Sequence, residues 1–81
     1  MSTPVNPPEA RISPGDLRSL MARHNIQAGE IGRRRGTSSK AVIMAKRADL
    51  IGRPYSAALM RELWSIINDI LLERERELCR T

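Results

Sequence analysis

Apolar residues recur three and four positions apart along much of the chain, which is the spacing of one face of an α-helix. Leu17, Leu20 and Met21 repeat in this way near the start. Between residues 55 and 79 there is neither Gly nor Pro, and the apolar positions with helical spacing are Leu59, Leu63, Ile66, Ile67, Ile70 and Leu71. The pattern predicts an all-α fold. The expected helices are three short ones, over about 13–24, 27–35 and 38–48, and a long C-terminal one over about 56–79.

The first short helix has a recognisable start. Ser13 can cap it, Pro14 can take the first helical position, where a missing N–H costs nothing, and Asp16 follows three residues after the cap. We expect this helix to end near His24, with Ile26 closing the core beside it.

The second and third short helices have the spacing of a helix-turn-helix. The positions that carry it are Ile31, Gly32, Gly36, Val42 and Ala45. Gly32 has no side chain to hold the two helices apart, and Gly36 can adopt the positive φ that ends the first of them. Thr37, Ser38 and Ser39 are candidate N-caps of the next helix. We therefore predict two helices that cross closely at this turn.

The third helix has two different faces. Val42 and Ala45 lie on the inner face, and the outer face holds Ser38, Ser39, Lys40, Ile43, Met44 and Arg47. A helix that contacts thymine methyls and phosphates can present Ile43 and Met44 beside cations. The alternative is that Ile43 and Met44 are core residues.

Charge is concentrated in the same part of the chain. The protein has 14 Lys and Arg against 9 Asp and Glu, a net charge of +5. Between Arg33 and Arg53 seven residues are basic and one, Asp49, is acidic. Such a run favours duplex nucleic acid as the partner, although a solvated basic face would look similar. RNA modules usually stack bases on aromatic residues, and this chain has only Tyr55 and Trp64.

Several other classes of function have little support. Cys79 is the only cysteine and His24 the only histidine, so we expect neither a disulfide within the chain nor a metal site. There is no phosphate loop and no catalytic constellation, so we expect no enzyme and no cofactor. The longest apolar run, five residues, is far too short for a membrane span, and no signal region is visible. We expect a cytoplasmic protein without a membrane partner.

The chain divides into three expected parts. They are a flexible arm over residues 1–12, a helix-turn-helix domain over 13–54 and a dimerisation helix over 55–81. Leu50 and Ile51 are expected to seal the bottom of the core before Gly52 turns the chain. A domain this small is marginal alone, and the last helix has more apolar residues than one face requires. The expected homodimer interface is Leu59, Leu63, Trp64, Ile66, Ile67, Ile70 and Leu71.

From Leu17 to Ile67 the chain resembles helix-turn-helix repressors of the Cro and phage-repressor type. The residues that carry the resemblance are Leu17, Ile31, Gly32, Gly36, Val42 and Ala45. The order of arm, helix-turn-helix and long helix is similar to small repressors of broad-host-range plasmids. Arg35 and Thr37 depart from the pattern, in which apolar residues are common at these positions.

The resemblance implies a homodimer that binds an inverted-repeat operator in double-stranded DNA and blocks a promoter. The residues it implies at the DNA are Gln27, Arg34, Ser38, Ser39, Lys40, Ile43, Met44, Arg47 and Arg53. The main alternative is an antitoxin-like protein, which binds DNA through its N-terminal region and a second regulatory protein through its C-terminal helix.

Overall fold

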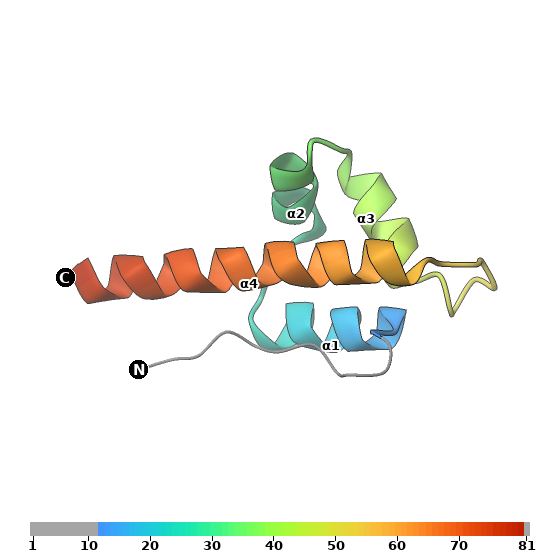
Figure 1. Ribbon diagram of the computed structural model, residues 1–81, viewed down its shortest axis with the longest axis horizontal. Helices are drawn as coiled ribbons and strands as arrows, with labels where there is room; N and C mark the ends of the chain where they lie inside the picture. Colours follow the sequence, from blue (N-terminus) through green and yellow to red (C-terminus); the bar gives the residue numbers. More distant parts are fainter. Residues whose placement is uncertain (1–11, 81) are drawn as a thin grey trace.

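The computed structural model describes residues 12–80, which form four α-helices and no strand (Figure 1). The helices are α1 (Pro14–Arg23), α2 (Ala28–Arg35), α3 (Ser39–Lys46) and α4 (Ala57–Arg80). The all-α prediction, with three short helices and a long last one, is confirmed. The predicted arm lies outside the described residues except for Ile12, which is buried in the core, so the arm does not extend as far as residue 12.

The ends of α1 follow from local sequence. Ser13 Oγ accepts a hydrogen bond from the Asp16 N–H at 3.2 Å, and the Ser13 N–H donates to Asp16 Oδ2 at 2.9 Å. These two bonds form the predicted capping box. Past the C-terminus, Asn25 has a φ of 52°, a value that Asn tolerates better than most residues, and the Ile26 N–H bonds back to the Met21 carbonyl at 2.9 Å.

The turn between α2 and α3 has the predicted geometry. Gly36 ends α2 with a φ of 79°, and the Thr37 N–H donates to the Gly32 carbonyl at 2.8 Å. Ser38 is the N-cap of α3, accepting from the Ala41 N–H at 3.3 Å. A Cβ placed on Gly32 would lie 2.9 Å from the Thr37 carbonyl oxygen, which is closer than real Cβ atoms approach. Only glycine lets the turn cross α2 this closely.

A single core joins all four helices. Figure 1 shows α4 running the length of the molecule, with α1 on one side of it and α2 and α3 on the other. The buried apolar residues of the three short helices and their connections are Ile12, Leu17, Leu20, Met21, Ile26, Ala28, Ile31 and Val42. Those of α4 are Met60, Leu63, Trp64, Ile67 and Ile70. The expected boundary at residue 54 therefore does not separate two folded units.

This core corrects much of the predicted dimer interface. Leu63, Trp64, Ile67 and Ile70 are buried within one chain, so the prediction that they face a second copy is wrong. The physical reason is that α4 has neighbours on opposite sides, which use a wide apolar band inside the monomer. The other three predicted interface residues, Leu59, Ile66 and Leu71, are partly buried against the same core.

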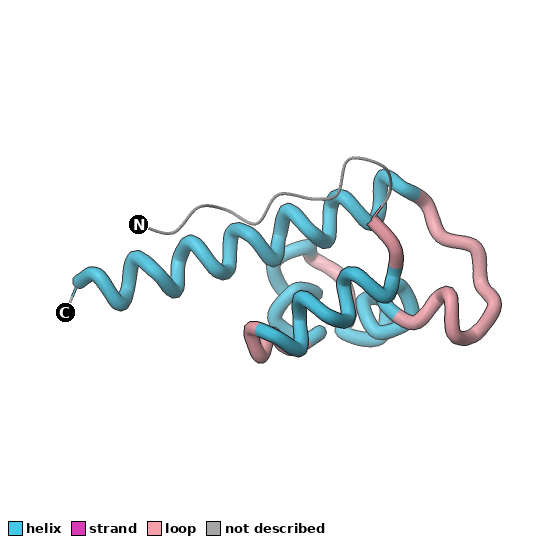
Figure 2. The backbone as a smooth tube through the Cα atoms, turned by 90° about the horizontal axis from the view of Figure 1, so that it is seen from below, coloured by secondary structure: helices cyan, strands magenta, loops and turns pink. Residues whose placement is uncertain are grey.

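The segment after α3 also differs from expectation. Leu50 and Ile51 do not seal the core, since their side chains are 62% and 43% exposed. The helix ends at Lys46, and the chain then turns outward, with the Leu50 and Ile51 N–H groups both bonded to the Arg47 carbonyl at 3.0 and 3.1 Å. Ala48 is buried in their place. The turn finishes at Gly52, whose φ is 68°. Figure 2 shows this loop at the end of the molecule where α4 begins.

Candidate nucleic-acid interface

The outer face of α3 is open to solvent. Val42 is buried and Ala45 packs against the core, whereas Ser39, Lys40 and Arg47 are exposed. These positions leave a continuous arc of about half the helix uncovered. The exposure of Ser39, Lys40 and Arg47 agrees with the predicted outer face of α3, and the burial of Val42 agrees with the predicted inner face.

The two apolar residues of the outer face behave differently. The Ile43 side chain is 38% exposed, which rules out the alternative that it is a core residue. Met44 is half-buried. It lines the wall of an open recess, so it still presents part of its side chain to a ligand that approaches α3.

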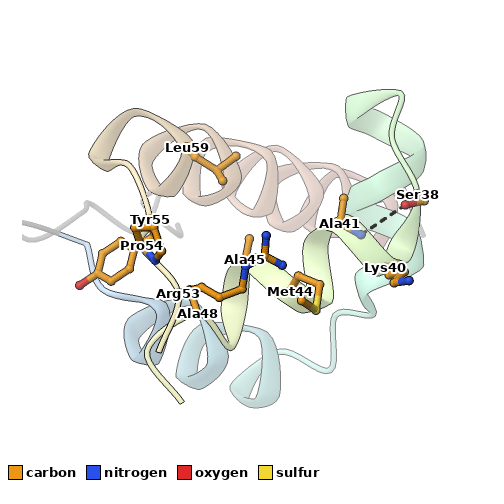
Figure 3. Close-up of a pocket in the computed structure, with 10 residues that line it drawn as sticks. All are labelled: Ser38, Lys40, Ala41, Met44, Ala45, Ala48, Arg53, Pro54, Tyr55 and Leu59. Atoms are coloured by element: carbon orange, nitrogen blue, oxygen red, sulfur yellow. Dashed lines mark hydrogen bonds between the residues drawn. The ribbon is translucent and has the colours of Figure 1, made fainter. Parts of the chain in front are cut away.

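That recess lies between α3, the following loop and the start of α4, and its volume is about 450 Å³. Its polar and aromatic lining residues are Ser38, Lys40, Arg53 and Tyr55, and its apolar lining residues are Ala41, Met44, Ala45, Ala48, Pro54 and Leu59. Figure 3 shows Lys40 and Met44 from α3 and Arg53 and Tyr55 from the loop around this space. The loop thus brings one more cation, Arg53, to the flank of α3.

The basic residues of this region fall into two groups. Arg34 pairs with Glu73 and Arg35 pairs with Glu62, so both arginines connect α2 to α4. The second group is Arg33, Lys40, Lys46, Arg47 and Arg53. Within residues 12–80 none of these five side chains takes part in an ion pair. The predicted DNA contact from Arg34 therefore competes with a bond inside the protein, whereas those from Lys40, Arg47 and Arg53 do not.

The one acid of the basic run, Asp49, is occupied by Arg18 of α1. Arg18 Nη1 lies 2.6 Å from Asp49 Oδ1 and also donates to the Lys46 carbonyl at 2.8 Å, which satisfies the C-terminus of α3. The hydrogen bond from Arg18 lowers the pKa of the Asp49 carboxyl and raises the pKa of the guanidinium. This bond fixes the end of α3 and neutralises the one acid between Arg33 and Arg53 in the sequence.

The remaining predicted contacts are the polar residues at the helix starts. The Ser38 hydroxyl already accepts the capping bond of α3, and it retains its own proton for a further bond. Gln27 precedes α2, is exposed and makes no capping bond with its side chain. Ser39 is exposed in the first turn of α3. All three are exposed at the N-terminus of a helix, where free N–H groups favour anions.

Three features of this site were missed by the sequence reasoning. Tyr55 lines the recess. Its position just after Pro54 in the sequence does not indicate that it lies beside α3. Glu62 and Glu73 hold the arginines of α2. Their separation of eleven residues, close to three helical turns, places both acids on one face of α4 and could have suggested a shared partner.

The described part of the chain holds no cluster of three or more His, Cys, Asp or Glu side chains suited to a metal ion. None of the helices within residues 12–80 is long and apolar enough to cross a membrane. Comparison of the chain with protein families, with curated proteins and with solved structures finds no match. The fold and the exposed basic helix define a small all-α protein with a candidate nucleic-acid interface at α3.

Proposed function

We propose that this protein binds duplex DNA in a sequence-specific manner and represses transcription, with α3 as the helix that enters the major groove. The observation that carries the proposal is the outer face of α3, where Lys40 and Arg47 have no ion pair and flank the exposed Ile43. Cations without internal partners are available to phosphates, and aliphatic side chains between them suit thymine methyl groups.

Each side chain has a role that follows from its place. Lys40 and Arg47 lie about two helical turns apart, so one binds near each end of the reading face, to phosphate or to a guanine edge. Ile43 and Met44 lie between them and contact base edges, together with Ser39. Gln27, Ser38 and Arg53 border α3 and bind the phosphate backbone, which fixes the orientation of the helix in the groove. In this proposal Arg34 stays with Glu73 and makes no essential contact.

The proposed unit of binding is a homodimer on an inverted repeat, acting in the cytoplasm. One copy offers a single short reading helix, which contacts only a few base pairs, whereas two copies related by a two-fold axis read two half-sites. A dimer seated on a promoter would exclude polymerase. The target therefore contains two similar short sequences in opposite orientation.

Selection of bound sequences from a random pool of duplex DNA tests this proposal, followed by protection of the selected site from cleavage. We expect a short pseudo-palindrome with half-site centres about 34 Å apart, one turn of the double helix. The informative variant is Ile43→Ala, which removes an exposed side chain and should relax base preference at one position of each half-site while total helix content stays the same. Leu50→Ala is a matched control, since it truncates another exposed aliphatic side chain outside α3. Recovery of no common sequence by the unmodified protein would contradict the proposal.

A further inference from the structure

The recess beside α3 has features of a small-molecule site that DNA binding alone does not require. Its volume, about 450 Å³, falls within the range of sites that hold small ligands, roughly 300 to 1,000 Å³. Apolar side chains form much of its wall, with a few polar groups among them, as in most such sites. The lining side chains come from α3, from the loop that follows it and from the start of α4 (Figure 3). A molecule bound in the recess would contact all three elements.

Small side chains leave the space open. Ala41, Ala45 and Ala48 recur at intervals of three and four residues, so they lie on one side of α3 and of the turn that follows it. Each side chain is a single methyl group, which leaves room for another molecule between α3 and Leu59 of α4. The result is a wall that is apolar but has no bulky side chain of its own to fill the recess.

Hydrogen bonds hold the other walls in place. The Arg53 N–H donates to the Ala48 carbonyl at 2.9 Å, which ties the loop to the end of α3. Ser56 Oγ accepts a hydrogen bond from the Leu59 N–H at 3.0 Å and so fixes the start of α4 beside the recess. A site whose walls are already fixed loses little conformational entropy when a ligand binds.

The charged residues of the recess select the sign of the ligand. Lys40 and Arg53 line it, neither has an ion pair within residues 12–80, and none of the lining residues is acidic. Figure 3 shows the Arg53 side chain extending from the loop toward α3, whereas the Tyr55 hydroxyl points away from α3. The ligand that fits is therefore an anion. A guanidinium suits a carboxylate in particular, because it can donate two parallel hydrogen bonds to it.

We propose that the recess binds a small carboxylate with an apolar body, and that this ligand and DNA exclude each other. Arg53 and Lys40 hold the carboxylate, and Met44, Pro54 and Leu59 contact the apolar body. A phosphate of DNA can neutralise the same cations, but it has no apolar surface to cover this wall. The exclusion rests on the proposed function, in which Lys40 and Arg53 also bind DNA. The ligand thus acts as an inducer that releases the protein from its operator.

Binding to the protein without DNA tests the site itself. The probe is 3-phenylpropanoate, followed by nuclear magnetic resonance through the amide signals of residues around the recess. Its neutral amide, 3-phenylpropanamide, and inorganic phosphate are measured alongside. We expect a dissociation constant on the order of 1 mM for an acid of this size. Both reference compounds should bind at least about tenfold more weakly, because the amide lacks the charge and phosphate lacks the apolar body.

Three variants locate the site. Arg53→Gln should weaken binding of 3-phenylpropanoate about tenfold. The matched control is Arg33→Gln, which removes an exposed cation of α2 that has no ion pair within residues 12–80 and does not line the recess. Ala41 is exposed, so Ala41→Leu should fill the recess and block the probe while helix content, measured by circular dichroism, stays the same. The inference fails if the acid binds no more tightly than either reference compound, or if the two arginine variants lose equally.

Competition with DNA separates this inference from the proposed function. At about ten times its dissociation constant, 3-phenylpropanoate should weaken affinity for the selected duplex roughly tenfold at constant ionic strength, and the amide should not. A ligand that fills the recess without weakening DNA binding would overturn the exclusion and leave the role of α3 untouched. A protein that binds the acid through Arg53 but has no affinity for any duplex would support the site and contradict the proposed function instead.

Discussion

The α2 and α3 helices have eight residues each and pack closely on one another, yet they relate to the rest of the protein in opposite ways. The α2 helix buries Ala28, Ile31 and Gly32, and its last two arginines are bound to acids of α4. Within α3 only Val42 is fully buried, and its cations have no ion pair in the described residues. The basic residues of α2 thus hold the fold together, whereas those of α3 are available to a ligand.

The difference follows from position relative to α4. The start of α4 passes α3 only at the recess near Leu59, and further along it passes α2, where Glu62 and Glu73 meet the arginines. The sequence places three consecutive arginines in α2, and Arg34 among them was predicted to contact DNA. In the structure Arg34 and Arg35 are neutralised by acids of α4, and charge that is neutralised within the protein attracts DNA less than charge that is not.

The largest effect on the fold should come from Gly32→Val. Its branched side chain would collide with the Thr37 and Ser38 carbonyls, which are backbone atoms that cannot move without opening the turn. We expect the free energy of unfolding to fall by about 3 kcal/mol or more. Denaturation by urea, followed by circular dichroism, measures it.

Gly29→Ala is the control for that substitution, because nothing lies within 4 Å of a Cβ at Gly29. Alanine is the better helix former, so this change should raise the free energy of unfolding by up to about 1 kcal/mol. Equal effects of the two substitutions would show that the close crossing at Gly32 is not what holds α2 and α3 together.

The next largest effect is on affinity for DNA, and it distinguishes the role of α3 from that of α2. Lys40→Ala with Arg47→Ala should weaken affinity for the selected DNA site by about 2 to 3 kcal/mol and leave stability almost unchanged, because neither side chain has an internal partner. Fluorescence anisotropy of labelled duplex gives the affinity. A double variant that binds as tightly as the unmodified protein would remove α3 from the interface.

Arg34→Ala with Arg35→Ala should instead lower stability slightly and change affinity for DNA little. These half-exposed ion pairs should each contribute less than about 1 kcal/mol to stability, and their loss should lower the unfolding temperature slightly. Affinity for the DNA site should change less than in the α3 double variant, although the two pairs of substitutions remove the same charge. A larger loss of affinity from the α2 pair would mean that these arginines leave Glu62 and Glu73 to bind DNA.

The smallest effect concerns the end of α3 and depends on pH. Because Arg18 lowers the pKa of Asp49 in the folded state, the bond stabilises the fold above the ordinary pKa of Asp, near pH 4, and is lost as pH falls through the lower folded value. Asp49→Asn should therefore be less stable than the unmodified protein at neutral pH, and the gap should close in acid. A gap that stays constant from pH 7 to pH 2 would show that the ionisation of Asp49 is not involved. Thermal unfolding across this range provides the measurement.

Which interactions the sequence could predict depends on how far apart the interacting residues lie along the chain. The capping box at Ser13, the turn at Gly36 and the cap at Ser38 depend on residues within a few positions, so the local pattern was enough. The pair between Arg34 and Glu73 joins residues 39 positions apart, and no local pattern predicts it. Leu50 and Ile51 looked like core residues because they are apolar, but the end of α3 at Lys46 puts Ala48 in the core position.

The wide apolar band of α4 packs within one chain and not, as the sequence had suggested, against a second copy. A helix that packs on one side needs only one stripe of apolar residues. The wider apolar band of α4 therefore suggested contact with a second chain. In the structure α1 and α2 contact α4 from opposite sides, so Leu63 and Ile67 both find neighbours within the monomer. The large apolar side chains left exposed within residues 12–80 lie mostly in or after α3, at Ile43, Leu50, Ile51 and Tyr55.

The most direct test of the central claim, that the unpaired cations of α3 and its loop bind phosphates, is the affinity for duplex DNA as a function of salt between about 50 and 200 mM. The logarithm of the association constant should fall linearly with the logarithm of salt concentration, by about 0.9 for each phosphate neutralised, and the slope should be shallower by nearly two for each copy carrying Lys40→Ala and Arg47→Ala. The Arg34→Ala and Arg35→Ala protein should keep the full slope. A flat dependence for the unmodified protein, or the same slope in the α3 variant, would contradict the claim.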